Sequence, residues 1–508
     1  MLLSLLGGCM VTSTWASNLV WILLAVNWLF EGRWREKWEM ARSSRLLHAF
    51  VALYLLLAVG LLWSSNLGAG GAELMVKLPL LVVPLILLTT PPLSPRERIP
   101  MLEVYVITTF IVSIISSVRL LTIPDLPYRD AVPYISHIRF ALNCCMVVFI
   151  CVMLAMEGRR EASRRPAFTV ACIVLAVWML AFLAMLRSFT GFAVLLTVSL
   201  IVMLVYRRRW PLIALWVLLV GGATVVVGHE VRSYYHMVPL ATEPLRPLTA
   251  NGNPYRHAQD GMVENGNYVN NYFCPSELSR AWNLRSSIAY DSVTASGYSV
   301  ESTLVRYLNA IGQTKDSAGL AAMTDDDIRA VERGVANPVY ESRNQLRKMV
   351  YVMLLEREFY IHTHAVAGFT MIQRFELWRA TCNIIRANPA FGVGTGDAVD
   401  CMHRELVAMD SELAGTTKKS HNQYLLLAAM IGLVGLAVVV FMFARAWYAG
   451  SHARDKRQKP SPLMLAWTVA ILVSCLTEDT LDTLAGILFC TFFLSNLTPS
   501  PLSERRGE

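Results

Sequence analysis

Charged residues are scarce in this chain of 508 residues. Asp, Glu, Lys and Arg make up 16% of the sequence, against 55% for hydrophobic residues, whereas soluble proteins carry about a quarter charged residues. A water-soluble multidomain enzyme is therefore nearly excluded. Glycine and proline are present in ordinary amounts, 29 and 22 residues, which excludes collagen-like and strongly disordered chains.

The ten cysteines contain no Cys-x-x-Cys pair and no Cys/His spacing typical of a metal site. Seven of them lie in or beside apolar runs, where cysteine behaves as a small hydrophobic residue. Cys274, Cys382 and Cys401 lie outside these runs, and a Cys382–Cys401 disulfide is an alternative to free thiols there. The sequence predicts no metal ion and no cofactor.

Long apolar runs are what the sequence has in abundance, and about 20 apolar residues cross a bilayer as a helix. Residues 1–30 hold no charged side chain; we predict two short spans there, although one span is the alternative. The fold class predicted is an all-α polytopic membrane protein with about twelve transmembrane helices, or eleven. Beyond residue 30 the expected spans are 46–64, 74–90, 101–118, 136–156, 167–186, 190–206, 210–228, 423–444, 462–477 and 482–496.

The net charge of +8 comes from alternate short connectors between the apolar runs. The intervening short connectors hold only Arg119, Arg129 and Arg187. This asymmetry places the basic connectors in the cytoplasm and argues against nucleic acid as a partner. The basic connectors lie at 33–45, 96–98, 159–165, 207–209, 445–459 and 505–506.

One large polar segment, 229–422, interrupts the apolar runs, and the alternation of sides places it in the periplasm. The predicted organisation is therefore transmembrane helices 1–9 in 1–228, the periplasmic segment, and helices 10–12 with a cytoplasmic tail in 423–508. The part of the segment up to Ser296 is predicted to be irregular, and the remainder mainly helical.

Local signals place the helices of the later part. Thr324 followed by Asp327 resembles a capping box, and Gly334 is a plausible stop. Glu341 to Tyr360 and Thr370 to Ala387 carry apolar residues at helical spacing. Asn388 precedes a proline and should end the second of these helices.

The most informative residues lie between Arg374 and Gly435. Arg374-Phe-Glu-Leu-Trp378 is followed by Pro389-Ala-Phe-Gly392-Val-Gly394, then by His421-Asn422 before an apolar run with Gly432 and Gly435. Arginine offers a fork of donors to phosphate, glycines let backbone N–H groups approach it, and histidine titrates near neutral pH. Each feature alone has a structural explanation: a solvated helix face, a turn, or packing at the membrane boundary.

Together and in this order, these residues resemble the O-antigen ligase and polymerase superfamily of bacterial envelope glycosyltransferases, whose fold is GT-C-like. The family also has an arginine at the end of a mid-chain span, often written Ser-Arg-Gly. Here Arg187 precedes Gly191 by four residues, so it is displaced by three, which keeps it on a similar helix face. The resemblance implies that His421, Arg374 and Arg187 are catalytic.

The resemblance implies a glycan donor on undecaprenyl diphosphate, presented at the periplasmic face of the bacterial inner membrane. Arg187 and Arg374 would stabilise the leaving diphosphate without a metal, and His421 would take the proton of the acceptor hydroxyl, with inversion at the anomeric carbon. The substrate-binding candidates, some with structural alternatives, are Asn422, Gly392, Gly394, His137 and Arg139. Lys77, an ionisable residue inside a span, is a weaker functional candidate.

The acceptor favoured is lipid A–core, as in an O-antigen ligase. A second lipid-linked repeat (a polymerase) or a protein (a protein O-oligosaccharyltransferase) are the alternatives. A transporter of lipid-linked glycans, a different class, also fits the span count, but few carboxylates and no internal repeat occur in the spans. Donor, acceptor and membrane lipids are thus the expected partners.

Overall fold

The computed structural model describes residues 1–91, 93–123, 126–158, 166–205, 210–235, 245–259, 262–364, 366, 370–416, 418–451 and 462–496. The described chain is mostly helical, with one two-stranded hairpin, which agrees with the helical membrane class. The basic connectors at 159–165, 207–209 and 505–506, and most of that at 445–459, lie outside the described residues.

Every predicted apolar run is mainly helical. The helices are α1 (Leu2–Thr12), α2 (Thr14–Phe30), α4 (Arg45–Val59), α5 (Leu67–Leu88), α6 (Pro95–Thr122), α7 (His137–Gly158), α8 (Pro166–Met185), α9 (Phe189–Val205), α10 (Trp210–Tyr235), α18 (Gln423–Ser451), α19 (Pro462–Thr477) and α20 (Leu484–Phe492). Six helical stretches of the described chain are long and apolar enough to cross a membrane: Arg45–Trp63, Leu67–Leu88, Arg96–Thr122, His137–Ala155, Pro166–Met185 and Gln423–Tyr448. The total of twelve or eleven spans stays a prediction.

The final predicted span, 482–496, differs from expectation. Only α20 is α-helical there, between the 3-10 helices η4 (Thr480–Asp482) and η5 (Phe493–Asn496). Nine residues of α-helix rise about 14 Å, which is less than the roughly 30 Å of bilayer hydrocarbon. Every residue of α20 from Ala485 to Phe492 is buried, so this helix packs inside the bundle.

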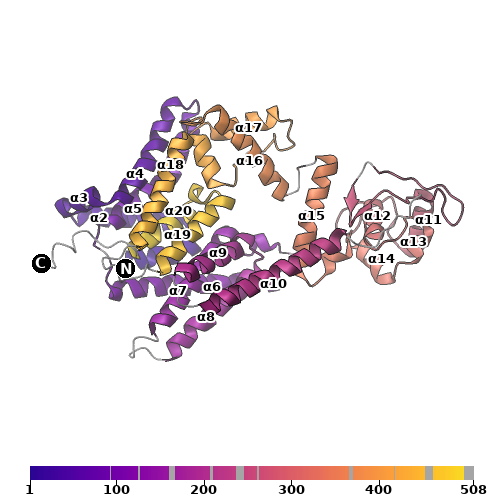
Figure 1. Cartoon of the computed structure of the whole chain (residues 1–508), viewed down its shortest axis with the longest axis horizontal. Coiled ribbons are helices and arrows are strands. Elements are labelled where there is room, and N and C mark those ends of the chain that lie inside the picture. Colours follow the sequence, from indigo (N-terminus) through magenta and orange to yellow (C-terminus); the bar gives the residue numbers. More distant parts are fainter. Residues whose placement is uncertain are drawn as a thin grey trace. The chain divides into compact units, whose positions relative to one another are not determined.

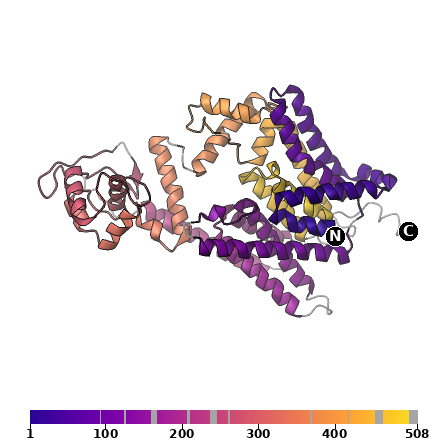
Figure 2. The ribbon, with the colours of Figure 1, turned by 180° about the vertical axis from the view of Figure 1, so that it is seen from behind.

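The chain forms two compact units. The first comprises Met1–Ile213, Leu377–Asp410 and Ala414–Glu508; the second comprises Ala214–Glu376 and Ser411–Leu413. Within the first unit, the N-terminal and C-terminal helices lie side by side, since α4 packs on α18, and α20 packs on both α1 and α5 (Figures 1 and 2). The first unit also contains α3 (Trp34–Ser43), η1 (Gly60–Trp63), η2 (Tyr128–Asp130) and α17 (Ala398–Ala408), together with most of α16 (Thr370–Ala387).

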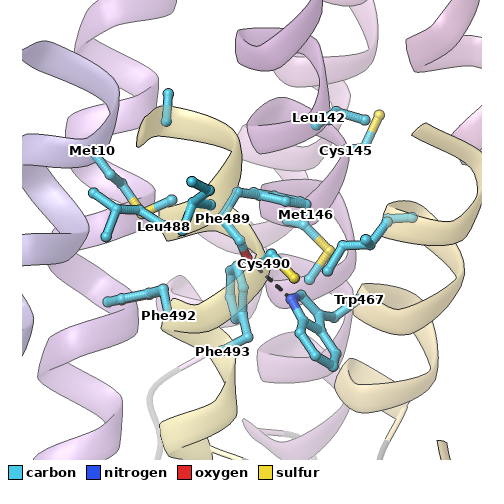
Figure 3. Packing of buried hydrophobic residues seen from close by; sticks show 14 of the residues in the cluster. Met10, Leu142, Cys145, Met146, Trp467, Leu488, Phe489, Cys490, Phe492 and Phe493 are labelled. Carbon is cyan, nitrogen blue, oxygen red and sulfur yellow. Dashed lines mark hydrogen bonds between the residues drawn. The ribbon is translucent and has the colours of Figure 1, made fainter. Parts of the chain in front are cut away.

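The core of the first unit is built around α20. Phe489, Phe492 and Phe493 are buried together, with ring centroids 5.2 to 5.9 Å apart. The indole Nε1 of Trp467 donates to the carbonyl oxygen of Phe489 at 3.1 Å (Figure 3). A buried indole needs a partner for its N–H group, so this bond helps to hold α19 against α20. The connector between Thr477 and Leu484 therefore joins two helices that pack on each other.

The second unit holds a small folded region with its own core, formed around Trp282, Leu304 and Leu308. Its hairpin pairs Val263 with Tyr268 and Glu264 with Asn267. The elements are β1 (Val263–Glu264), β2 (Asn267–Tyr268), α11 (Pro275–Arg285), α12 (Val300–Ala310), α13 (Ser317–Ala321), α14 (Asp325–Glu332), η3 (Pro338–Glu341) and α15 (Gln345–Thr363).

Helix α11 lies in a stretch expected to be irregular, so that prediction was wrong there. Pro275 starts the helix, and Leu278 and Trp282, one turn apart, are fully buried, a packing gain that outweighs the Asn- and Gly-rich surroundings. The capping box at Thr324 and Asp327 is confirmed, and α14 ends at Glu332 before Gly334, whose φ is +95°.

Helix α16 has the predicted bounds and ends before Asn388, whereas α15 begins at Gln345 because Asn344 caps it. All ten cysteines lie in described residues and are free thiols, so the alternative Cys382–Cys401 disulfide is not formed.

Candidate active site

The glycine-rich turn pairs with a break in α18. The backbone leaves helical geometry at Ile431 (φ −128°, ψ 16°) and Gly432 (φ 69°, ψ −173°). The carbonyls freed by the break accept from the turn: Val393 N–H donates to Ala429 at 2.8 Å, and Gly394 N–H donates to Met430 at 3.0 Å. In the other direction, the N–H of Leu433 donates to the carbonyl of Pro389 at 2.8 Å. An unsatisfied backbone group in a bilayer costs several kcal/mol, so the turn and the break stabilise each other.

Glycine is required on both sides of this contact. A Cβ at Gly392 would lie 2.4 Å from the carbonyl oxygen of Ala429, and one at Gly432 would lie 2.0 Å from that of Ala390. The N–H of Gly392 donates to the carbonyl of Asn388 at 3.1 Å. The N–H groups of Gly392 and Gly394 both have protein acceptors, so the structure shows a packing role for these glycines. Their contact with substrate stays a prediction.

The same turn is attached to the start of α5. Both oxygens of Asp397 accept backbone N–H groups, from Ser65 and Asn66, each at 2.8 Å. These bonds lower the pKa of the Asp397 carboxyl, although burial opposes them. The turn is thereby held between α18 and the connector before α5.

Asn422 is the N-cap of α18. Its side-chain oxygen accepts from the N–H groups of Tyr424 and Leu425, both at 3.1 Å, and the residue is buried. Capping uses this oxygen to satisfy helix N–H groups. Asn422 therefore starts α18 immediately after His421, and its contact with substrate stays a prediction.

His421 is held in an unusual backbone conformation beside a buried carboxylate. Its φ is +50°, in the left-handed region that few non-glycine residues adopt. Its N–H donates to Asp479 Oδ2 at 3.2 Å, and its Nδ1 lies 3.8 Å from the same oxygen. The side chain is 40% exposed, so one edge of the imidazole faces the carboxylate while the ring remains accessible to a substrate.

Trp378 holds the residue before His421. Its indole Nε1, on α16, donates to the carbonyl of Ser420 at 2.9 Å. The tryptophan of the motif thus acts on the histidine segment through a single hydrogen bond. Arg374 lies on the same helix one turn earlier, is half-buried and belongs to the second unit; its place beside His421 stays a prediction.

Asp479 combines burial with incomplete hydrogen bonding. Its Oδ1 has no hydrogen-bond partner among the described residues. Burial raises the pKa of Asp479 to about 7, and the carboxylates of Asp482 and Glu478 add to the shift. This carboxyl therefore titrates near neutral pH while it touches the candidate catalytic histidine.

The remaining predicted residues of the first unit come from two places, the start of α7 and the residues that follow α8. Arg139, near the start of α7, donates from Nη2 to the carbonyl of Asp479 at 3.4 Å, and its buried Nε has no partner in the part of the chain that is described. The guanidinium of Arg187 lies 5.8 Å from the centre of the Tyr128 ring, within the range of a cation–π contact. The His137 ring packs on the edge of that same tyrosine, at 5.9 Å between centroids.

Arg187 shares a backbone feature with His421. It follows the end of α8 with a φ of +51°, and its side chain is exposed. Left-handed conformations at non-glycine residues cost energy and concentrate at functional sites. The structure thus connects Arg187 to His137 through Tyr128, and Arg139 to His421 through Asp479, all within the first unit.

A group of charged side chains next to this site has almost no signal in the sequence. We call Glu73, Lys77, Lys419 and Asp482 the buried ion-pair network. Lys77 contacts Glu73 at 2.5 Å and Asp482 at 2.8 Å, and Lys419 contacts Asp482 at 2.6 Å and also pairs with Glu73. Lys77, an ionisable residue inside an apolar run, was the one available signal; the other three lie where polar residues are ordinary.

No group of three His, Cys, Asp or Glu side chains able to hold a metal occurs among the described residues. Arg187 and Arg139 can each offer a guanidinium group to an anion, and His421 can accept a proton, because its neighbour Asp479 stabilises a charged imidazole when ionised.

Comparison with known proteins adds a family to this geometry. Residues 346–440 match the family model described as O-antigen ligase, which supports the resemblance to the O-antigen ligase superfamily, whose members are glycosyltransferase-like enzymes. The matched residues include Arg374, the glycine-rich turn, His421 and the break in α18. Among curated proteins, no match to the chain was found.

Proposed function

We propose that the chain transfers a glycan from undecaprenyl diphosphate to lipid A–core, as an O-antigen ligase-like glycosyltransferase of the bacterial inner membrane with its site facing the periplasm. The observation that carries the proposal is His421, inside the residues matched to the O-antigen ligase family, held at the buried carboxylate of Asp479 with Arg139 beside it. The periplasmic side rests on the distribution of basic connectors.

The proposed reaction is a direct, metal-independent displacement. The acceptor hydroxyl attacks the anomeric carbon, its proton passes to His421, and the bond to the diphosphate oxygen breaks with its electron pair on the leaving group. Arg187 and Arg374 stabilise the growing charge of the diphosphate. Arg139 extends this positive surface, and His137 offers a hydrogen bond beside it. Attack from the face opposite the diphosphate inverts the anomeric carbon.

Asp479 has a defined part in this scheme. When ionised, it stabilises the imidazolium that forms as His421 takes the proton, and its contact with the His421 N–H keeps the residue in its left-handed conformation. A carboxyl that titrates near pH 7 makes this support dependent on pH.

The acceptor decides between related activities. A polymerase would use a second lipid-linked repeat, and a protein O-oligosaccharyltransferase a protein hydroxyl, with the same donor chemistry. A transporter of lipid-linked glycans is the competitor from a different class; the family match and the placement of His421 against Asp479 argue for chemistry at this site.

Deletion of the gene tests the proposal, read on a gel of surface lipopolysaccharide. A ligase predicts loss of all long glycans on lipid A–core while lipid-linked polymer accumulates. A single-repeat cap would indicate a polymerase instead. Unchanged lipopolysaccharide with loss of protein glycans would indicate the protein-modifying activity, and intact glycan transfer with impaired flipping would indicate the transporter.

A further inference from the structure

The buried ion-pair network brings together two helices and a connector that are distant in sequence. Glu73 and Lys77 lie one turn apart on α5, Lys419 precedes α18, and Asp482 belongs to η4 between α19 and α20. Its two cations and two carboxylates balance in charge. Lys77 is fully buried, and the side chain of Asp482 is 5% exposed.

Burial makes the balance of charge important. A buried ion left without its partner is strongly destabilising, so each member depends on the others. The pKa of Lys419 reflects this dependence: burial would lower it, but Asp482 and Glu73 raise it above its ordinary value.

The network is attached to both sides of the candidate catalytic histidine. Lys419 lies two residues before His421 and Gln423 two residues after it. The Gln423 side chain accepts from the N–H of Leu481 at 2.6 Å and donates to Asp482 at 3.4 Å. Asp482 is in turn three residues from Asp479, which accepts the His421 N–H.

We propose that the buried ion-pair network positions His421 against Asp479, and that Lys77 and Glu73 of α5 are positioning residues for the glycan transfer. The inference rests on the proposed function, because it assigns the network to that same reaction. Lys77 and Glu73 act through Lys419 and Asp482, which hold the two chain segments that carry the histidine and its carboxylate. The alternative is a network that only stabilises the fold.

The first test compares kinetic constants of variants purified in nanodiscs, with undecaprenyl-diphosphate-linked glycan as donor and lipid A–core as acceptor. Lys77→Met leaves a buried carboxylate unbalanced, and we expect kcat to fall by about tenfold or more while KM for the donor stays within about twofold. Glu73→Gln added to Lys77→Met restores neutrality, and we expect it to recover most of the lost kcat.

A matched control exists in the same chain. Arg35 and Glu39 form an ion pair with the same spacing of four residues, at 3.4 Å, but their side chains are 93% and 48% exposed. Arg35→Met, alone or with Glu39→Gln, should leave kcat unchanged, because exposed pairs contribute little. Should Lys77→Met fail to fold, Glu73→Gln, which keeps the shape of the side chain, supplies the single variant.

The second test is the pH profile of kcat, which a purely stabilising role would not move. The charged groups around Asp479 are Glu478, Asp482, Lys419, His421 and Arg139. Asp482→Asn removes a negative charge and should shift the acidic limb to lower pH. Lys419→Met removes a positive charge and should shift the limb to higher pH. Opposite shifts are the signature of a network that acts on the His421–Asp479 pair.

The outcomes separate the two proposals. If the unaltered protein transfers no glycan, or if His421→Ala retains full transfer, the proposed function is refuted and the positioning role with it. If His421→Ala abolishes transfer but Lys77→Met and Glu73→Gln keep the kcat of the unaltered protein, the positioning role alone is refuted. Shifts of the acidic limb in one direction for both Asp482→Asn and Lys419→Met would also refute it.

Discussion

Substitution of Gly432 by alanine tests whether the break in α18 and the glycine-rich turn form one structural unit. The backbone there (φ 69°, ψ −173°) lies in a region that is essentially restricted to glycine, and occupying it with another residue costs about 1–3 kcal/mol. The new Cβ would also lie 2.0 Å from the carbonyl oxygen of Ala390 and 2.5 Å from the N of Phe391. These are backbone atoms, so the whole turn has to move.

That movement weakens the hydrogen bonds between the turn and the break. Loss of those from Val393 to Ala429 and from Leu433 to Pro389 adds about 1 kcal/mol each. Gly432→Ala should therefore destabilise the protein by about 3–5 kcal/mol. We expect a clear fall in the melting temperature of the purified protein in detergent, measured by loss of the monodisperse peak after heating, together with loss of glycan transfer.

Gly71, within α5, provides the control. A Cβ there would meet no atom within 4 Å, and alanine in a helix interior is favoured over glycine by about 0.5–1 kcal/mol. Gly71→Ala should therefore match or slightly exceed the melting temperature of the unaltered protein. If Gly432→Ala melts at the same temperature as Gly71→Ala, the account of the break as a glycine-dependent unit is wrong.

Two further predictions concern the surroundings of His421. Trp378→Phe removes the hydrogen bond to the Ser420 carbonyl, which is worth about 1 kcal/mol, so we expect kcat to fall while the melting temperature changes little. Trp15→Phe, at a residue that is 74% exposed, is the control. Equal kcat values in the two variants would contradict the role of Trp378. Asp479 has a pKa near 7 in the fold, against 3.8 ordinarily, so its contribution to stability is present below about pH 4 and is lost as the pH rises to about 7. The melting temperature of the unaltered protein relative to Asp479→Asn should therefore fall between pH 4 and pH 7, and a flat difference would contradict the assigned burial.

Much of the fold follows from the pattern of apolar residues. The length of the apolar runs alone predicted helices at the expected spans. Local signals, such as Thr324 with Asp327 and Asn388 before Pro389, predicted where helices begin and end. The length of a helix was harder to predict where tertiary packing determines where the helix ends. The run at 482–496 is apolar enough for a span, but its residues are buried within the bundle as a nine-residue helix between 3-10 turns.

The sequence singled out candidate residues for the site, but not their backbone conformations or their neighbours. His421 and Arg187 both stand at left-handed positions next to helix ends, which no sequence pattern indicated. Gly392, Gly394 and Asn422 were predicted to contact substrate, which stays a prediction. Their packing against α18 and capping of α18 were not predicted. Of the buried ion-pair network only Lys77 was singled out, while Asp479, Glu73, Lys419 and Asp482 were missed. A single charged residue in a connector or near a helix end carries little signal until the fold brings it together with its partners.

The central claim is that His421 performs the chemistry of glycan transfer, and in vitro transfer with purified components tests it most directly. The measurement uses undecaprenyl-diphosphate-linked glycan, lipid A–core and protein in nanodiscs, with chelator present throughout. The account predicts transfer by the unaltered protein and by His403→Ala, whose side chain is exposed on α17, and no detectable transfer by a normally folded His421→Ala protein. Transfer by His421→Ala at the rate of His403→Ala would contradict it.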